Sequence, residues 1–398
     1  MRLRGRITYK FLTLIVAIII LALICINNLA PSSKKDEFVT LLPPPLERED
    51  VPFEQEQPVT AKEFSADLNL KKLINLPNFE YEIPNNACHK YGKAMLAIII
   101  VTSYAGHDEL RAAHRLAIPQ SKLADMDMQR VFLLAAIPPT EKFVTQKQLL
   151  DEQERFGDLV QGNFQESYHN LSYKHVMGLR WAGNECSKAK FIIKIDDDII
   201  YDVFHFKRYL ESLELQQPKL IKSANYLAGY VLRGRPPVRN TASKWYVSEQ
   251  EWSASSYPDY LSGWMYITNP ATALRLVKEA QNSTFFWIDD TWITGILREK
   301  LKLEMQRLNA WYSANAEFID CCVRDLKQPT SYECEYFVGP NGGDTKMLVE
   351  FLHNVEKCYF DECNKRPPAK SVKKTCVGSV KNLLPDHGRG QVKQVALR

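Results

Sequence analysis

The chain has 398 residues, of which 45% are hydrophobic and 11% aromatic, and its formal net charge at pH 7 is +4. This composition excludes a wholly disordered chain and allows one large or two ordinary folded domains. The charge is small and dispersed, which excludes the basic surface typical of nucleic-acid binding, so we expect no nucleic-acid partner.

The N-terminus predicts a membrane anchor. Four cationic residues, Arg2, Arg4, Arg6 and Lys10, precede an apolar run from Phe11 to Ile26. The run is near the lower limit for a spanning helix, about 17 residues, and the cationic flank favours a cytosolic N-terminus. A cleavable signal ending at Ala30 is the alternative, but Asn28 stands where a small residue is preferred. We predict a cytosolic tail at residues 1–10, a transmembrane signal-anchor at 11–30 and a lumenal remainder.

The cysteines fit the oxidising lumen that this anchor implies. Cys25 lies in the anchor, and the other eight are Cys88, Cys186, Cys321, Cys322, Cys334, Cys358, Cys363 and Cys376. We expect several disulfides, whose pairing the sequence leaves open. A zinc site among the last cysteines is the alternative, although their spacing lacks the Cys-x-x-Cys pattern.

Strand-like and helix-like segments alternate after a stem at residues 31–87, which is rich in Pro, Glu, Lys and Gln. The expected strands are Ala94 to Thr102, Val131 to Ile137, the segment that begins at Phe191, and Leu227 to Val231. The expected helices are Asp108 to Leu116, Gln146 to Arg155, Leu171 to Trp181, and Ala271 to Ala280. This alternation predicts an α/β fold with a mostly parallel sheet, whose ligands bind beyond the carboxyl ends of the strands.

Three consecutive carboxylates, Asp196, Asp197 and Asp198, are flanked by β-branched apolar runs and are expected at the end of a buried strand. Alternation along the strand would point the first and third side chains the same way. Crowded carboxylates call for a cation, and hard oxygen ligands suit Mg²⁺ or Mn²⁺. The triplet therefore predicts a metal-diphosphate site, with a solvated acidic turn as the alternative.

A series of motifs follows in order along the chain. They are Arg111-Ala-Ala-His-Arg115, Val131-Phe-Leu-Leu, the stretch from Phe156-Gly-Asp to Asn170-Leu-Ser-Tyr-Lys174, Trp181, Cys186, Lys194-Ile-Asp-Asp-Asp198, Lys244-Trp-Tyr-Val247, Tyr257-Pro258, Tyr260, Gly263 and Asp289-Asp290. Together, from about Met95 to Leu303, they resemble the β-1,3-glycosyltransferases of glycosyltransferase family 31. The departures from the family pattern are Ala117-Ile118, Gly263-Trp264-Met265-Tyr266, Thr291 and Thr294, which border the sugar and acceptor sites as the family would place them. The cysteine-rich tail after Arg307 does not align with the family pattern.

The resemblance implies a GT-A type fold, a UDP-sugar donor and inversion at the anomeric carbon. It makes Asp198 the direct metal ligand, with Asp196 and Asp197 contacting the metal, the ribose or the donor sugar. A divalent cation, Mn²⁺ or Mg²⁺, would stabilise the departing diphosphate as a Lewis acid.

The resemblance also places the family's base at Asp290, with Asp289 as the second choice. The apolar neighbours of Asp290 in the sequence would raise its proton affinity, as a base requires. The alternative, which can hold at the same time, is that the acidic pair caps a following helix from Thr291 to Lys300.

Several other residues are candidates for binding or structural roles. Arg111 and Arg115 could bind the diphosphate or nucleotide by fork-like hydrogen bonds, or lie on a solvated helix face. Lys194 could pair with the acidic triplet as part of the donor site, or it could form an ion pair with a purely structural role. We interpret His169 and His175 as surface histidines. Trp245 is interpreted as core or loop support rather than as a sugar platform.

The resulting expectation is a single-pass type II Golgi membrane enzyme, with a catalytic domain at residues 88–310 and a cysteine-rich extension at 311–398. It would transfer galactose from UDP-galactose to the 3-hydroxyl of a glycan on a glycoprotein or glycolipid. UDP-N-acetylglucosamine and UDP-N-acetylgalactosamine are the alternative donors. A catalytically silent glycan-binding protein is the alternative from another class.

Overall fold

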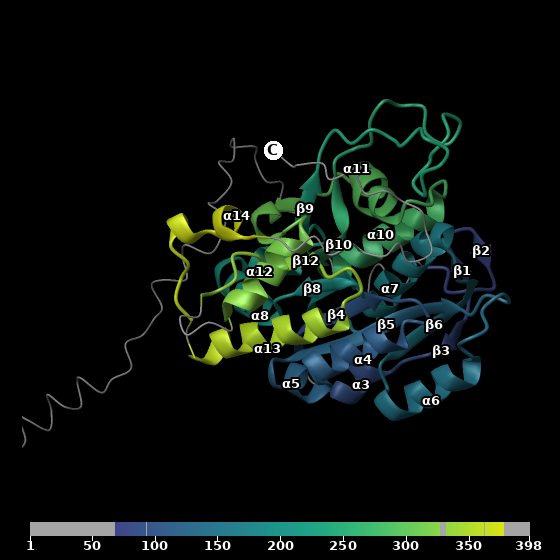
Figure 1. Ribbon diagram of the computed structural model, residues 1–398. Coiled ribbons are helices and arrows are strands. Elements are labelled where there is room, and N and C mark those ends of the chain that lie inside the picture. Colours follow the sequence, from purple (N-terminus) through teal and green to yellow (C-terminus); the bar gives the residue numbers. More distant parts are fainter. Residues whose placement is uncertain (1–67, 93, 327–331, 362, 378–398) are drawn as a thin grey trace, which may run out of the picture. The chain divides into compact units, whose positions relative to one another are not determined.

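The computed structural model describes residues 68–92, 94–326, 332–361 and 363–377 (Figure 1). Its main sheet is built from β3 (Tyr81–Ile83), β4 (Met95–Thr102), β5 (Met128–Ala136), β6 (Leu159–Gln165), β7 (Ala189–Asp196), β9 (Leu227–Leu232), β10 (Tyr260–Thr268) and β11 (Gln306–Arg307). The order across the sheet is β11-β9-β10-β7-β4-β5-β6-β3. The central strands β7, β4, β5 and β6 are parallel, whereas β10 is antiparallel to both of its neighbours. The expected α/β fold with a mostly parallel central sheet is confirmed.

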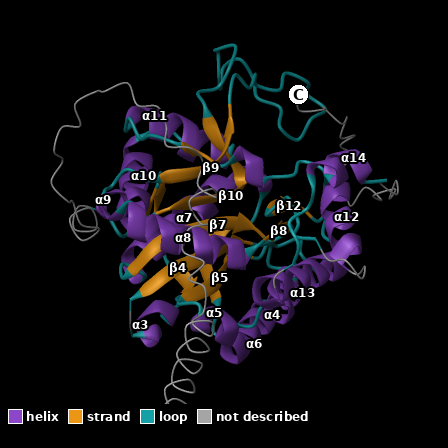
Figure 2. Cartoon of the chain, turned by 90° about the vertical axis from the view of Figure 1, so that its left-hand side faces the viewer, coloured by secondary structure: helices purple, strands orange, loops and turns teal. Residues whose placement is uncertain are grey.

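Helices cover both faces of this sheet (Figure 2). They are α3 (Ala87–Tyr91), α4 (Asp108–Ala117), α5 (Gln120–Asp125), α6 (Gln146–Phe156), α7 (Leu171–Glu185), α8 (Val203–Gln216), α9 (Pro218–Lys222) and α10 (Pro270–Asn282). Strand β4 is buried along nearly its whole length, because it is apolar on both faces, as a central parallel strand must be. Helices α7 and α10 pack against one another on one face, and His114 of α4 packs on Phe132 of the other face.

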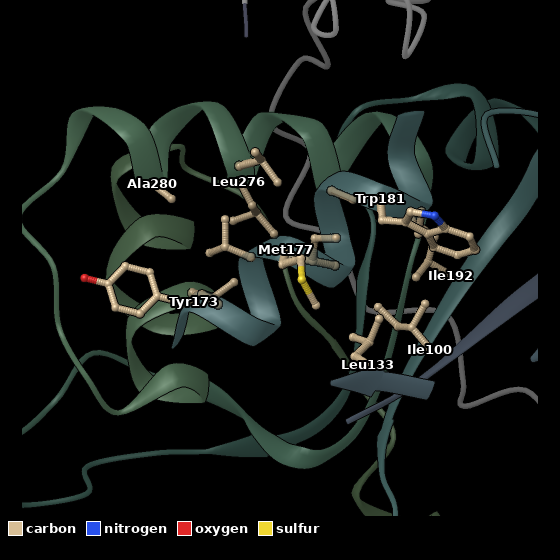
Figure 3. Close-up of a cluster of buried hydrophobic side chains, with 14 of the residues drawn as sticks. Ile100, Leu133, Tyr173, Met177, Trp181, Ile192, Leu276 and Ala280 are labelled. Carbon is tan, nitrogen blue, oxygen red and sulfur yellow. The ribbon is translucent and has the colours of Figure 1, made fainter. Parts of the chain in front are cut away.

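A hydrophobic cluster of the core lies between the sheet and the layer of α7 and α10 (Figure 3). Ile100, Leu133 and Ile192 point from three adjacent strands toward Met177 on α7. A Cβ added at Gly178 of α7 would lie 2.2 Å from Leu133 Cδ1, so only glycine lets the helix approach this closely. The core therefore fixes α7 on the sheet, and its first turns, which carry polar residues of the site, reach the carboxyl end of β4, where Lys174 donates to the backbone oxygen of Ser103.

The fold begins earlier than the sequence predicts. Strands β1 (Lys72–Leu73) and β2 (Leu76–Pro77) form a small antiparallel pair, and β3 joins the main sheet beside β6. Ile74 is buried, and a disulfide ties Cys88 to Cys186 at the end of α7. The predicted stem boundary at residue 87 is therefore wrong, because residues 68–87 already bury apolar side chains in the domain.

The segment after residue 310 packs onto the domain. Its elements are α12 (Ala316–Leu326), β12 (Val338–Pro340), α13 (Thr345–Asp361) and α14 (Val372–Thr375). Strand β12 pairs with β8 (Ile199–Tyr201), the short strand that directly follows the acidic triplet. Helix α13 lies along α4 (Figure 1).

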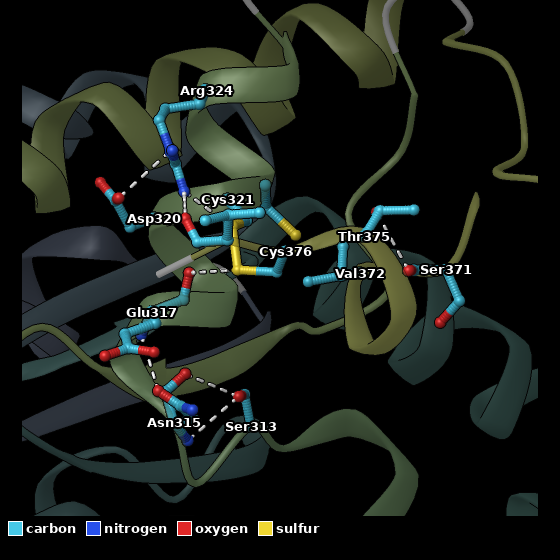
Figure 4. The surroundings of a disulfide bond; sticks show 12 residues. Ser313, Asn315, Glu317, Asp320, Cys321, Arg324, Ser371, Val372, Thr375 and Cys376 are labelled. Carbon is cyan, nitrogen blue, oxygen red and sulfur yellow. Dashed lines mark hydrogen bonds and ion pairs between the residues drawn. A yellow bond between two sulfur atoms is a disulfide. The ribbon is translucent and has the colours of Figure 1, made fainter. Parts of the chain in front are cut away.

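Three disulfides hold this extension together, and they confirm the expected disulfide chemistry. They join Cys321 to Cys376 (Figure 4), Cys322 to Cys334, and Cys358 to Cys363. Cys322 lies in α12 and Cys334 shortly before β12, so the second bridge fixes the strand that pairs with β8.

The predicted cytosolic tail, the signal-anchor and residues 31–67 of the predicted stem lie outside the described residues. Within residues 68–377, as far as they are described, no helix is long and apolar enough to cross a membrane.

Candidate active site

The acidic triplet stands at the carboxyl end of β7, as predicted, and its three side chains have different surroundings. Asp196 ends the strand and its side chain is 32% exposed. Asp197 is buried and receives a hydrogen bond from His107 Nδ1, 2.9 Å from its Oδ2. The Asp198 side chain is exposed. Asp196 and Asp198 are thus open to a ligand, whereas Asp197, predicted to contact the donor, is held inward by the protein.

Two histidines of the α4 region hold Asp197. Although burial opposes ionisation, the hydrogen bond and charge of His107 keep the pKa of Asp197 below its usual value. His114 is fully buried and donates from Nε2 to the backbone oxygen of Asp197. Asp197 is therefore ionised and held in place by the protein, and its position fixes the directions of the Asp196 and Asp198 side chains.

Lys194 pairs with the triplet, as one reading of the sequence proposed. Its ammonium group is buried and lies 2.5 Å from Asp196 Oδ1. Burial raises the pKa of Asp196 to about 7, and the lysine charge opposes this rise. The same ammonium group donates to the backbone oxygen of Gly263 in β10.

Gly263 connects the triplet to the second acidic pair. Its backbone N–H donates to Asp290 Oδ2 at 3.0 Å, while its carbonyl accepts from Lys194, which in turn pairs with Asp196. The register of β10 against β9 shifts between Leu261 and Tyr266, and such irregularities re-aim backbone groups beside active sites. The two acidic motifs, far apart in the sequence, therefore meet across β7 and β10.

Asp290 also caps the helix that follows it. Its Oδ1 accepts from Thr291 N at 2.7 Å, at the start of the π-helix η3 (Thr291–Leu297), which is followed by α11 (Arg298–Lys300). The helix-capping reading is thus confirmed for Asp290, although the helix is of the π type, which is common at functional sites. This hydrogen bond to one carboxylate oxygen holds the Asp290 side chain in a fixed position.

His175 was predicted at the surface, and this prediction is wrong. The residue is only 1% exposed, its Nδ1 lies 2.8 Å from Asp289 Oδ2, and its Nε2 lies 2.6 Å from the Tyr266 hydroxyl. Helix α7 is buried on most of its circumference, so its polar positions face protein rather than water. His169, by contrast, is exposed and stacks on Trp287.

The two carboxylates of the pair have opposite pKa shifts. Burial, followed by the charge of Asp289, raises the pKa of Asp290 above its usual range. Burial opposes the ionisation of Asp289, but the hydrogen bond from His175 and the charge of Lys194 hold its pKa low. Two carboxylates whose environments separate their pKa values are suited to different roles, and Asp290 is the one able to take up a proton near neutral pH.

Arg111 and Arg115 do not fit the predicted donor-binding role. Arg111 is fully buried, forms a two-point ion pair with Glu152, and donates to the backbone oxygens of Tyr104 and Ala105. Arg115 contacts Glu152 and Asp158 and is 11% exposed. The solvated-face alternative fails as well, because these guanidinium groups are occupied by carboxylates inside the fold. Through its bonds to Tyr104 and Ala105, Arg111 supports the loop after β4.

The carboxylates of Asp196 and Asp198 suit a divalent cation whose other ligands come from a bound small molecule. Among the described residues, no group of three or more His, Cys, Asp or Glu side chains is arranged to hold a metal ion. Mg²⁺-type ions in diphosphate sites commonly use one or two carboxylates together with phosphate oxygens and water, rather than a cage made of protein alone. Asp196 and Asp198, open at a strand end, match that smaller requirement.

Several residues of the site were not predicted. His107 and His114 hold Asp197, and Tyr266 bonds to His175. The C-terminal extension contributes Asn341, whose backbone N–H donates to the backbone oxygen of Asp198 at 3.1 Å. For His114, its place between Arg111 and Arg115 on the inward side of a helix could have signalled burial. Nothing in the sequence indicates the contact of Asn341.

Comparison with known proteins gives a consistent family. The family model described as Galactosyltransferase matches residues 111–309. The chain is 30% identical over 230 residues to a lactosylceramide 1,3-N-acetyl-beta-D-glucosaminyltransferase of Xenopus tropicalis, covering 56% of this chain and 59% of that protein. It is 30% identical over 244 residues to beta-1,3-galactosyltransferase 1 of Mus musculus, covering 61% of this chain and 71% of that protein.

The human lactosylceramide 1,3-N-acetyl-beta-D-glucosaminyltransferase is 28% identical over 60% of this chain and 63% of its own length. The chain thus spans less than two thirds of the first relatives that it matches. Among solved structures, the WbbM bifunctional glycosyltransferase is similar with a TM-score of 0.34 and 10% identity, over 68% of this chain and 52% of that chain, too low a similarity to support an argument. The family match and the mouse relative are sufficient to conclude that the chain belongs to the galactosyltransferase family, glycosyltransferase family 31.

Proposed function

We propose that this chain is an inverting, metal-dependent β-1,3-hexosyltransferase that moves galactose from UDP-galactose to the 3-hydroxyl of an acceptor glycan. The family match and the names of the relatives support a hexosyltransferase. One observation carries the mechanism: Gly263 bonds both to Lys194, the partner of Asp196, and to Asp290. It thereby joins the ligand-accessible end of β7 to a carboxylate whose pKa is raised.

The chemistry follows from this pair of sites. Asp290, when ionised, accepts the proton of the acceptor 3-hydroxyl as that oxygen forms a bond to the anomeric carbon. The bond from that carbon to the diphosphate oxygen breaks, and UDP leaves with the electron pair. Attack from the face opposite the leaving group inverts the anomeric centre. This geometry needs a carboxylate beside the diphosphate site, and Asp290, bonded to Gly263 of β10, would lie beside the end of β7.

A divalent cation bound by Asp198 and Asp196 would stabilise the negative charge of the departing diphosphate. Asp197 holds its two neighbours in position through His107. Lys194 neutralises part of the charge that Asp196 adds to the site, which limits repulsion of an anionic donor.

The proposal extends to fold type and location. A GT-A type fold is supported by the mostly parallel sheet with the acidic triplet at the carboxyl end of β7. A type II Golgi membrane protein with a lumenal catalytic domain is supported by the apolar run at residues 11–26 and by the disulfides, which need an oxidising compartment. Glycoproteins or glycolipids are the proposed acceptors.

A donor screen tests the proposal. The protein would be incubated with Mn²⁺, a panel of galactose- and N-acetylhexosamine-terminated acceptors, and UDP-galactose, UDP-N-acetylglucosamine or UDP-N-acetylgalactosamine in turn. We expect UDP release with UDP-galactose and a β-1,3 product by NMR. Release with an N-acetylhexosamine donor alone would replace the proposed donor but keep the reaction. Absence of release with all three donors, together with glycan binding, would favour the silent glycan-binding alternative.

A further inference from the structure

Two exposed aromatic side chains lie next to one another and share a cation. Tyr168 is 40% exposed and Trp245 is 44% exposed. The ammonium group of Lys244 lies 5.1 Å from the ring centroid of Tyr168 and 4.7 Å from that of Trp245. Trp245 is thus not a core residue, and we call these three residues the aromatic platform.

The aromatic platform adjoins the acidic pair. The Tyr168 ring lies 6.1 Å from Trp287, which precedes Asp289 by two positions, and neighbouring His169 stacks on Trp287 at 4.2 Å. Ser172, one turn further on, donates to the backbone oxygen of Phe286 at 2.7 Å. The start of α7 and the segment before Asp289 are thus bonded together, which fixes Tyr168 beside the carboxylates.

The electrostatics of Tyr168 agree with this placement. Burial of its hydroxyl, together with the charges of Asp289 and Asp290 and then of Asp196, raises the pKa of Tyr168 well above its usual range. The phenol therefore stays protonated and able to donate a hydrogen bond. The ring contact between Tyr168 and Trp287 places the platform beside the acidic pair.

The loop that carries Lys244 and Trp245 is held in place by the fold. It belongs to the connection from β9 to β10, seen at the top of Figure 1. Val247 is fully buried, Arg239 donates to its backbone oxygen at 2.7 Å, and Val238 forms a bridge with Tyr246. Glu251, later in the same loop, accepts from the Trp287 indole at 3.2 Å. The platform is therefore preorganised and tied to the acidic pair from both sides.

We infer that Tyr168, Lys244 and Trp245 form the surface that receives the acceptor, a neutral terminal pyranoside whose C–H face lies on the Trp245 ring. Lys244 and the Tyr168 hydroxyl would donate hydrogen bonds to its ring hydroxyl groups. The acceptor hydroxyl must reach Asp290, and Tyr168 and Trp245 are exposed aromatic groups, of which Tyr168 contacts Trp287, three residues before Asp290. This inference rests on the proposed transferase function, and it adds the residues that select the acceptor.

The test is a kinetic comparison of Trp245→Ala, Trp245→Phe and Tyr168→Phe with the wild type. We expect Trp245→Ala to raise the acceptor KM about ten-fold, the value of one good aromatic contact, with Trp245→Phe in between. The donor KM and the slow hydrolysis of the UDP-sugar without acceptor should change less than about two-fold. Phe143→Ala is the matched control, because Phe143 is 91% exposed and belongs to another loop.

The outcomes separate the platform from other roles. An unchanged acceptor KM, or an equal rise of the donor KM, would overturn the inference. If an acceptor carrying a sulfate or carboxylate is preferred by the wild type and this preference is lost in Lys244→Met, the ligand is anionic and the neutral class is wrong. If the wild type shows no turnover, saturation-transfer NMR with methyl β-galactoside, UDP and Mn²⁺ still tests whether the platform binds a pyranoside. Binding lost in Trp245→Ala would support the platform, and absence of binding to the wild type would reject it.

Discussion

His175 and Asp289 form a buried hydrogen bond of 2.8 Å that determines how the acidic pair is charged. Burial lowers the pKa of His175, so its ring is neutral at neutral pH. Because an ionised carboxylate only accepts hydrogen bonds, the network assigns the proton to Nδ1, and Nε2 accepts from the Tyr266 hydroxyl. This neutral histidine keeps Asp289 ionised, and the charge of Asp289 in turn raises the pKa of Asp290.

The first prediction concerns this histidine. His175→Ala should leave the Asp289 carboxylate and the Tyr266 hydroxyl without their partner, which costs about 1–3 kcal/mol of the free energy of unfolding per buried group. His175→Asn keeps a donor close to the position of Nδ1, whereas His175→Gln keeps a polar group near that of Nε2. We expect kcat to fall in the order Asn, Gln, Ala. Equal kcat for the Asn and Gln variants, at equal Tm, would mean that the bond to Asp289 does not matter for catalysis.

The second prediction separates the two acidic motifs. Asp290→Asn removes the base and should lower kcat about 10²- to 10⁴-fold, while binding of UDP with Mn²⁺ persists. Asp198→Ala should instead abolish the Mn²⁺ dependence of UDP binding. Isothermal titration with and without Mn²⁺, alongside initial rates, checks both variants. Retained activity in Asp290→Asn would remove Asp290 from its role as the base.

The third prediction is a pH profile. Asp290 acts when it is deprotonated, so kcat/KM rises with pH through its raised pKa. Asp289→Asn removes the neighbouring negative charge, while the amide oxygen of asparagine can still accept from His175. The pKa of Asp290 should then fall, and the acid limb of kcat/KM should move to lower pH. A limb that stays in place or moves to higher pH would contradict the charge coupling between the two carboxylates.

The fourth prediction concerns the glycine between the motifs. A Cβ at Gly263 would lie 3.2 Å from Asp290 Cβ and 3.3 Å from its Oδ2, so the carboxylate must shift by a few tenths of an ångström. We expect Gly263→Ala to lower kcat about ten-fold, because small displacements of a catalytic group are costly. The neighbouring change Ser262→Ala serves as the control. Unaltered kcat in Gly263→Ala would show that Asp290 tolerates this displacement.

Much of the fold could be predicted from the sequence because the signals are local. The apolar run of β4 and the polar stretch of α4 correspond to the observed Met95–Thr102 and Asp108–Ala117 within a residue or two. The position of the triplet at the end of β7 followed from the same pattern. Strand β10 was missed because Tyr260–Thr268 is rich in aromatic and small residues and its register is irregular.

The site was predicted only where a chemical group has a sequence signature. Consecutive carboxylates have one, so the triplet and the acidic pair were found. A histidine on a helix has none, because its burial depends on what the fold packs around that helix, as with His175. Arg111 was misread for the same reason, since its partner Glu152 lies on another helix.

The contact between Asn341 and Asp198 has a consequence for how the protein matures. The donor end of the site needs β12 beside β8 and the Cys322–Cys334 bridge, both supplied by residues beyond the end of the family match at 309. During synthesis the triplet leaves the ribosome long before its partner strand does, and closing so long a loop is slow. We therefore expect activity to appear only after the segment beyond residue 309 has folded and its Cys322–Cys334 bridge has formed, which would prevent sugar transfer by incomplete chains.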